Sequence, residues 1–157
     1  MLAIIWHSRT GAARAMAQAA SDAAGAYAHL IRADDVTPAF VESCKGYLFV
    51  CPENLASMSG EMKEMFDRCY YPLLGQIEGR PFATMVAAGS DGHGATAQID
   101  RIVTGWRLKR IADPIICNLG AQTPEEILAD KFLSPEQLAP CRELGAAMAE
   151  GLAMGIF

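Results

Sequence analysis

The sequence predicts an α/β fold, a doubly wound five-stranded parallel sheet with helices on both faces. Short apolar runs recur along the chain without the alternation of half-exposed strands, as in parallel strands covered on both faces. Segments with helical spacing of apolar residues separate these runs, and a parallel sheet accommodates that alternation. With 157 residues the chain is long enough to bury a core, so we expect a single domain spanning residues 1–157.

The first half of the chain contains three of the five predicted strands. The alanine-rich run after the first strand is a helix whose small residues allow close approach to a sheet, and Gly25 ends it. The third strand is apolar throughout, and we expect Pro52 to stop it. In chain order the elements are a strand at 2–6, a helix at 12–24, a strand at 27–31, a short helix at 36–43, a strand at 46–51 and a helix at 60–71.

One face of the helix at 60–71 is an apolar stripe made of Met62, Met65, Phe66, Cys69 and Tyr70. A methionine-rich stripe is more typical of core packing than of cofactor contact. Core packing is also the expected role of Tyr70 and Tyr71, with the lining of a pocket as the alternative.

The second half supplies the last two strands, at 82–88 and 111–118, with a helix at 95–106 between them. Two capping boxes follow, Thr123-Pro124-Glu125-Glu126 and Ser134-Pro135-Glu136-Gln137. Each combines an N-cap hydroxyl with an acidic or amide residue three positions on, and each has proline at the first helical position. The second box opens a helix that runs to about residue 152.

Composition excludes several classes of function. The net charge of −5 gives no basic stripe for nucleic acid. The five cysteines include no Cys-x-x-Cys pair. Together with the three histidines, their spacing indicates neither a metal site nor a disulfide framework. No stretch is long and apolar enough to cross a membrane, so we expect a cytoplasmic protein with reduced thiols and no nucleic-acid or membrane partner.

The first strand ends in a turn that suits an anion. A small, hydroxyl-rich turn that opens directly into a helix offers unpaired N–H groups and the positive end of the helix dipole. A plain N-cap turn is the alternative, and Arg9 either adds charge or faces solvent. The turn consists of Ser8, Arg9, Thr10, Gly11, Ala12 and Ala13.

Two later turns also follow predicted strands. The turn after the third strand can lay backbone and apolar side chains against a flat ring, or it is an ordinary connection. The glycines of the turn after the fourth strand let N–H groups approach a ligand, and His93 either adds a donor or faces solvent. The second turn comprises Pro52, Glu53, Asn54, Leu55, Ala56, Ser57 and Met58, and the third comprises Gly89, Ser90, Asp91, Gly92, His93 and Gly94.

These three turns meet at the carboxyl edge of a doubly wound sheet, where such folds bind their ligands. In this order they resemble the flavodoxin-like superfamily, in its NAD(P)H-dependent FMN reductase and quinone reductase branch, over about residues 1–118. The resemblance implies a strand order of 2-1-3-4-5. It also implies FMN as cofactor, with its phosphate at residues 8–13, the edge of its isoalloxazine ring at 52–58 and the ring's O2/N1 side at 89–94.

Two departures from that pattern matter. Ala13 stands where the flavodoxin phosphate loop ends in a hydroxyl residue, which removes one donor. Neither of the last two turns contains an aromatic residue, whereas electron-carrier flavodoxins commonly sandwich the ring between aromatics. The open flavin face implies hydride transfer from NAD(P)H to flavin and then to a small acceptor such as a quinone, with no catalytic side chain assigned.

The sequence leaves two other functions open and excludes two other families with doubly wound folds. The alternatives are a flavodoxin-type electron carrier and a non-catalytic module that binds a phosphate-bearing ligand. A receiver domain is excluded because no acidic pair follows the first strand, and a low-molecular-weight phosphatase because Ser57 stands where Cys-x₅-Arg needs arginine. Fold analogy also suggests a homo-oligomer with residues 119–133 in the contact.

Overall fold

The computed structural model describes residues 1–157, in which strands and helices alternate along the chain. The strands are β1 (Leu2–Trp6), β2 (Ala28–Arg32), β3 (Gly46–Asn54), β4 (Ser57–Met58), β5 (Pro81–Ala88), β6 (Lys109–Arg110) and β7 (Ile115–Asn118). The α-helices are α1 (Ala12–Ala24), α2 (Pro38–Ser43), α3 (Gly60–Cys69), α4 (His93–Gly105), α5 (Pro124–Leu128) and α6 (Pro135–Met154).

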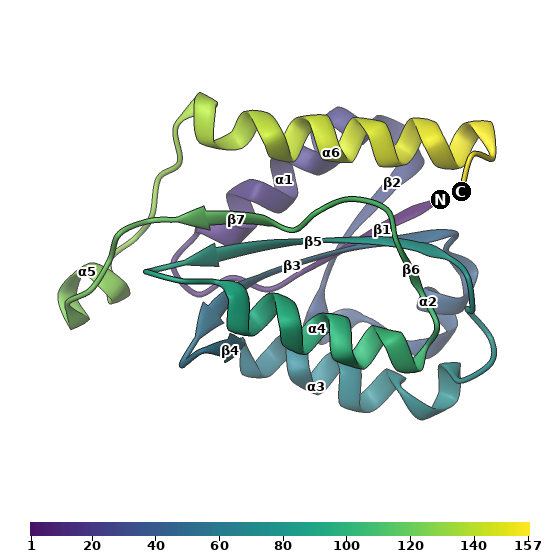
Figure 1. The fold of residues 1–157 in the computed structure, drawn as a ribbon. Helices are drawn as coiled ribbons and strands as arrows, with labels where there is room; N and C mark the ends of the chain where they lie inside the picture. The colour runs from purple at the N-terminus through teal and green to yellow at the C-terminus, as the bar shows by residue number, and fades with distance from the viewer.

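The sheet has the predicted architecture (Figure 1). Its order is β2-β1-β3-β5, and both β6 and β7 pair in parallel with β5. These two short strands are the parts of the predicted fifth strand, so the α/β class and the order 2-1-3-4-5 are confirmed. Pro114 lies between the two parts, and its missing N–H explains why a single strand does not form there.

Two helical layers enclose the sheet. Helices α1 and α6 lie together on one face, and α2, α3 and α4 cover the other (Figure 1). The predicted methionine-rich stripe of α3 belongs to the core, since Met62, Met65, Phe66 and Cys69 are all buried there. None of the helices combines the length and the apolarity that a bilayer crossing requires.

Both predicted capping boxes are present. The Thr123 hydroxyl accepts a hydrogen bond from the Glu126 N–H, and the Ser134 hydroxyl accepts one from the Gln137 N–H. Other helix ends differ by about two residues from their expected positions, because α2 begins at Pro38 after its N-cap Thr37 and α4 begins at His93.

Strand β3 passes through Pro52, so the expectation that this proline ends the strand is wrong. The carbonyl of Val50 accepts a hydrogen bond from the His7 N–H on the β1 side. Proline two residues later faces the same side, beyond the last paired residues Trp6 and Val50, so its missing N–H interrupts no pairing with β1. Beyond Pro52, β3 forms an antiparallel hairpin with β4.

The chain between β7 and α6 lies beyond the carboxyl ends of the strands. We call residues 119–133, which include α5, the strap. Figure 1 shows α5 at this end of the sheet, opposite the end where both chain termini lie. This arrangement brings a segment from late in the chain to the turn that follows β1.

Candidate functional site

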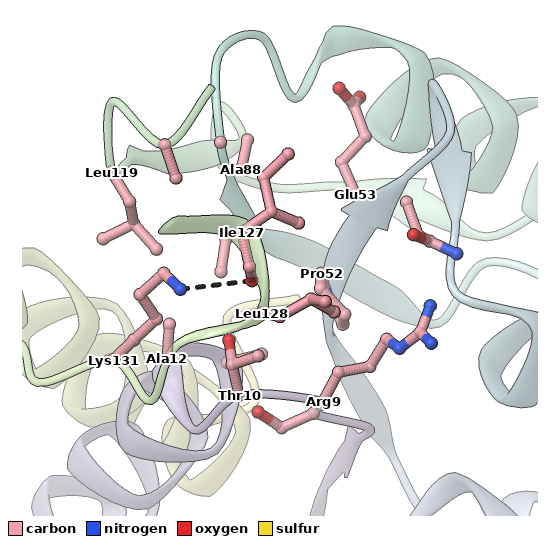
Figure 2. Close-up of a pocket in the computed structure, with 16 residues that line it drawn as sticks. Arg9, Thr10, Ala12, Pro52, Glu53, Ala88, Leu119, Ile127, Leu128 and Lys131 are labelled. Atoms are coloured by element: carbon pink, nitrogen blue, oxygen red, sulfur yellow. Dashed lines mark hydrogen bonds between the residues drawn. The ribbon is translucent and has the colours of Figure 1, made fainter. Parts of the chain in front are cut away.

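A cavity of about 110 Å³ lies at the carboxyl edge of the sheet, between the turn after β1 and the strap (Figure 2). Small and apolar residues make up much of its wall, with hydroxyl and charged groups at its margin. The lining residues are Ser8, Arg9, Thr10, Ala12, Ala13, Pro52, Glu53, Asn54, Ala87, Ala88, Gly89, Leu119, Ala121, Ile127, Leu128 and Lys131.

The amino end of α1 opens toward this cavity without a side-chain cap. Its N-cap is Gly11, with φ of +103°, and no side chain accepts a hydrogen bond from the first turn. The Ser8 hydroxyl accepts instead from the Gly11 N–H at 3.1 Å and so holds the turn itself. Ala12 and Ala13, the first helical residues, line the cavity, so their N–H groups and the positive end of the helix dipole suit an anion.

The amino end of α4 already has an anionic partner. The Glu53 carboxylate accepts hydrogen bonds from the Gly92 N–H at 2.8 Å and from the Ala95 N–H at 3.0 Å. Figure 2 accordingly shows the Glu53 side chain directed away from Thr10 and the turn after β1. The N–H groups of the third turn that Glu53 occupies are therefore not directed to the cavity.

At the amino end of α3, a buried histidine connects two of the turns. Nδ1 of His7 lies 2.9 Å from Oγ of Ser59, and Nε2 lies 3.6 Å from a carboxylate oxygen of Glu61. Burial lowers the pKa of His7 from its usual value of 6.5, and the negative charge of Glu61 opposes that effect. The neutral imidazole thus ties the end of β1 to the start of α3.

The β3–β4 hairpin contains a two-residue turn of unusual composition. Leu55 and Ala56 both have positive φ, 51° and 59°, which is uncommon for residues other than glycine. The Leu55 side chain is 94% exposed. Gly94 packs beneath this turn so closely that a Cβ there would lie 2.2 Å from the Ala56 carbonyl oxygen. Only glycine fits at that position without a shift of the hairpin.

The structure brings together about half of the predicted site residues. Those that line the cavity are Ser8, Arg9, Thr10, Ala12, Ala13, Pro52, Glu53, Asn54 and Gly89. Those that do not line it are Gly11, Leu55, Ala56, Met58, Ser90, Asp91, Gly92, His93 and Gly94. Their assignment to a cofactor stays a prediction. His93 is 80% exposed on the side chain and contacts Asp91, as in the solvent-facing alternative.

Sequence reasoning missed the strap as a wall of the site. Leu119, Ala121, Ile127, Leu128 and Lys131 all line the cavity. Nothing in the local sequence indicates this, because the contacts join segments far apart in the chain. Ala87 and Ala88 were within reach of prediction, since they end the strand before the third turn.

The strap rests directly on two glycines of the site. The Lys131 N–H donates to the Thr10 carbonyl at 2.7 Å, and a Cβ on Gly11 would lie 3.3 Å from the Lys131 carbonyl oxygen. A Cβ on Gly89 would lie 2.7 Å from the Ala121 carbonyl oxygen. Glycine at 11 and 89 therefore allows the strap to approach both turns.

Neither a reactive thiol nor an aromatic lid belongs to the cavity. Burial raises the pKa of the Cys51 thiol to about 12, so no thiolate forms beside Pro52 at neutral pH. Tyr70 packs against Trp106 as expected, with 5.9 Å between ring centroids. Tyr71 is exposed at another surface, so the core role expected of it is wrong. The structure contains no group of three or more histidine, cysteine or carboxylate side chains that could hold a metal ion.

Comparisons with known proteins find a related family and several similar solved structures. A family model described as NADPH-dependent FMN reductase matches residues 35–112. Over this segment the chain is similar to the FMN reductase family, and its fold is that of the flavodoxin-like superfamily. The match spans the second turn and the third, which are two of the three turns that carried the resemblance.

Solved structures support the same fold. A flavodoxin from the domain Archaea superposes with a TM-score of 0.76 at 18% identity, over 98% of this chain and 99% of that one. A Megasphaera elsdenii flavodoxin gives 0.71 at 22% identity, over 96% and 99%. A flavodoxin, WrbA-like protein from Agrobacterium tumefaciens gives 0.70 at 16%, over 95% and 94%. No curated protein sequence matches the chain. Fold and family together support a flavin-binding oxidoreductase.

Proposed function

We propose that this protein binds FMN and transfers reducing equivalents from NAD(P)H through the flavin to a small acceptor such as a quinone. The observation that carries the proposal is the amino end of α1, which has no side-chain cap and borders the cavity. The ends of α2, α5 and α6 are capped by their own hydroxyl residues, and that of α4 by Glu53. The amino end of α3 also lacks a side-chain cap, but none of its residues lines the cavity. The phosphate of FMN would therefore bind at the uncapped end of α1.

The rest of the cavity suits an apolar ring. Its wall between β3 and β5 contains Pro52 together with Ala87, Ala88 and Gly89, whose small side chains leave room against the sheet edge. The volume of about 110 Å³ is below the roughly 300–1,000 Å³ of typical small-molecule sites. A flavin therefore requires the strap to shift outward, and Ile127 and Leu128 would then contact the ring instead of solvent.

The lining of the cavity and the description of the matching family favour an enzyme over a one-electron carrier. When bound, the flavin supplies the hydride chemistry, and the protein supplies binding, orientation and exclusion of water. None of the residues lining the cavity is aromatic, so no side chain of the cavity wall competes with a nicotinamide or a quinone for the ring face. NAD(P)H as co-substrate rests on the description of the matching family.

Titration of the apo-protein with FMN, followed by quenching of flavin fluorescence, tests the proposal. We expect saturable one-to-one binding, and then NADH or NADPH oxidation that depends on both FMN and an added quinone. An absence of binding at tens of micromolar FMN would contradict the flavin proposal and favour the phosphate-ligand module.

A flavodoxin-type electron carrier is the second candidate, because the matching solved structures include flavodoxins. Steady-state kinetics separates the two. An enzyme oxidises NAD(P)H by itself with a small acceptor, whereas a carrier is reduced only when a separate reductase is added.

We also propose that two copies of the chain meet through the strap. Its Phe132 and Leu128 side chains are 90% and 70% exposed, which is unusual for large apolar residues on one short segment. Sedimentation at micromolar concentration should then report a dimer or tetramer. A monomer with full activity would contradict this part of the proposal.

A further inference from the structure

The strongest unassigned feature of the site is the Lys131 side chain. It lines the cavity from the strap, on the opposite side of Thr10 from Arg9 (Figure 2). The guanidinium group of Arg9 points away from Thr10, whereas the ammonium group of Lys131 lies over the cavity margin (Figure 2). Lys131 thus places a cation at the cavity margin, where it bonds to carbonyl oxygens of the strap.

The ammonium group of Lys131 is held by main-chain carbonyls alone. It donates to the carbonyl oxygens of Glu126 and Ala129 and, at 3.2 Å, to that of Ile127. No carboxylate forms an ion pair with it. The Glu126 carboxylate instead accepts from the N–H groups of Gln122 and Thr123. The ammonium group therefore has main-chain carbonyls as its only hydrogen-bond partners, and its charge acts on the Glu126 carboxylate at longer range.

Its backbone holds Lys131 at the turn. The hydrogen bond from its N–H to the Thr10 carbonyl, together with the close approach to Gly11, joins the strap to the turn at this residue. A side chain that starts there needs only a rotation to exchange carbonyl oxygens for an anion at the amino end of α1. Hydrogen bonds from an ammonium group to a charged oxygen are about twice as strong as those to neutral acceptors, which favours the exchange.

The turn after β1 supplies only uncharged donors to an anion. The Ser8 hydroxyl is engaged by the Gly11 N–H, and Ala13 contributes no hydroxyl. The Thr10 hydroxyl and the first N–H groups of α1 remain as donors, all of them neutral. A phosphate monoester near neutral pH has between one and two negative charges. These donors and the helix dipole, worth roughly half a positive charge, balance only part of the charge on the phosphate.

We propose that Lys131 is the phosphate-binding cation of the flavin site, held beside the turn after β1 by the hydrogen bond of its own N–H to Thr10. The inference rests on the proposed function, because it assigns a residue to the phosphate of the same ligand. It makes Lys131 a determinant of specificity for FMN over riboflavin, which lacks the phosphate.

The test compares the dissociation constants of FMN and riboflavin in the wild type and in Lys131→Met. Methionine keeps an unbranched side chain and removes the charge. We expect FMN affinity to fall about tenfold or more, as for the loss of a hydrogen bond to a charged group, while riboflavin affinity changes less than about twofold. Lys131→Arg should restore most of the FMN preference. Lys109→Met, an exposed lysine of β6 at the other end of the sheet, is the matched control and should change neither affinity.

The outcomes separate this inference from the proposed function. If the wild type binds FMN and Lys131→Met binds it equally well, Lys131 does not bind the phosphate, although the flavin proposal stands. If Lys131→Met lowers the affinities for FMN and riboflavin equally, Lys131 only maintains the conformation of the strap, and the inference is overturned as well. If the wild type binds neither flavin, both proposals fail. Riboflavin binding by the variant at wild-type strength shows that its site is folded.

Discussion

The amino ends of α1 and α4 have almost the same backbone but different surroundings. Gly11 and Gly92, their N-cap glycines, have φ and ψ of 103° and −22°, and of 98° and −17°. Both helices follow a buried strand of the same sheet and extend for 13 residues. Yet α4 has the Glu53 carboxylate at its amino end, and α1 has an open cavity.

The difference shows that the sequence of a turn does not by itself decide whether a helix end binds a ligand. Both turns are rich in glycine or small residues, and both helix dipoles attract an anion. A carboxylate from a third segment, β3, satisfies one of them within the protein. We infer that α4 serves to fix the hairpin and that α1 serves the ligand.

The largest expected effect follows from giving α1 a carboxylate of its own. In Thr10→Glu the new charge lies beside the proposed phosphate position, much as Glu53 lies at α4. Two unit charges about 4 Å apart repel by roughly 4 kcal/mol at an effective dielectric constant near 20. FMN affinity should therefore fall by about 100-fold or more in a fluorescence titration.

Thr10→Gln is the matched control, because it has nearly the same size without the charge. It should weaken FMN binding by less than about tenfold, as for the loss of one neutral hydrogen bond. If Thr10→Glu binds FMN as well as Thr10→Gln does, the phosphate does not bind at α1.

The next effect concerns the hairpin side of the comparison. Gly94→Ala places a Cβ where the Ala56 carbonyl lies, so the hairpin and α4 must separate. We expect the free energy of unfolding, measured by urea denaturation, to fall by about 1–3 kcal/mol. Gly60→Ala, in the first turn of α3 with open space around it, should be neutral or slightly stabilising. Equal stabilities for the two variants would mean that Gly94 does not support the hairpin.

Glu53→Gln should have a smaller effect on stability. A glutamine side chain can accept with one oxygen only, so one of the Gly92 and Ala95 N–H groups loses its acceptor and α4 loses the charge at its amino end. We expect a loss of about 1–2 kcal/mol in the free energy of unfolding. Glu150→Gln, on the exposed side of α6, should change it by less than about 0.5 kcal/mol. Equal free energies of unfolding for the two variants would mean that the Glu53 carboxylate does not stabilise the amino end of α4.

The smallest effect is the pH dependence of stability contributed by His7. Because burial lowers its folded-state pKa, the folded protein binds fewer protons than the unfolded chain between that pKa and 6.5. This contribution to stability is fully present above about pH 6.5 and is lost as the pH falls through the window.

Denaturation curves between pH 5.5 and 8 measure this slope. In His7→Gln the slope should be shallower than in the wild type. His93→Gln, which removes an exposed imidazole, is the control. A wild-type slope that survives in His7→Gln would assign the pH dependence to other groups.

The features that the sequence predicts correctly are those decided by neighbouring residues. The turn at Ser8–Thr10 and the two capping boxes at Thr123 and Ser134 depend on residues a few positions apart. Apolar runs likewise indicate the buried strands, because burial on both faces leaves no other composition.

The features that it does not predict depend on distant partners. Glu53 accepts from N–H groups 39 and 42 positions away, so no local pattern indicates that it caps α4. The strap reaches Thr10 from the far end of the chain through a main-chain hydrogen bond, which no side-chain pattern encodes. Leu55 and Ala56 form a turn that local preference assigns to glycine or asparagine, so its shape also had no local signal.

The central claim is that α1, and not α4, binds the phosphate. Amide ¹H–¹⁵N spectra of the protein saturated with FMN and with riboflavin test it most directly, since the two ligands differ only at the phosphate. We expect the amide shifts of Ala12 and Ala13 to differ most between the two complexes, while those of Gly92 and Ala95 coincide. Differences centred on Gly92 and Ala95, with Ala12 and Ala13 unchanged, would contradict it.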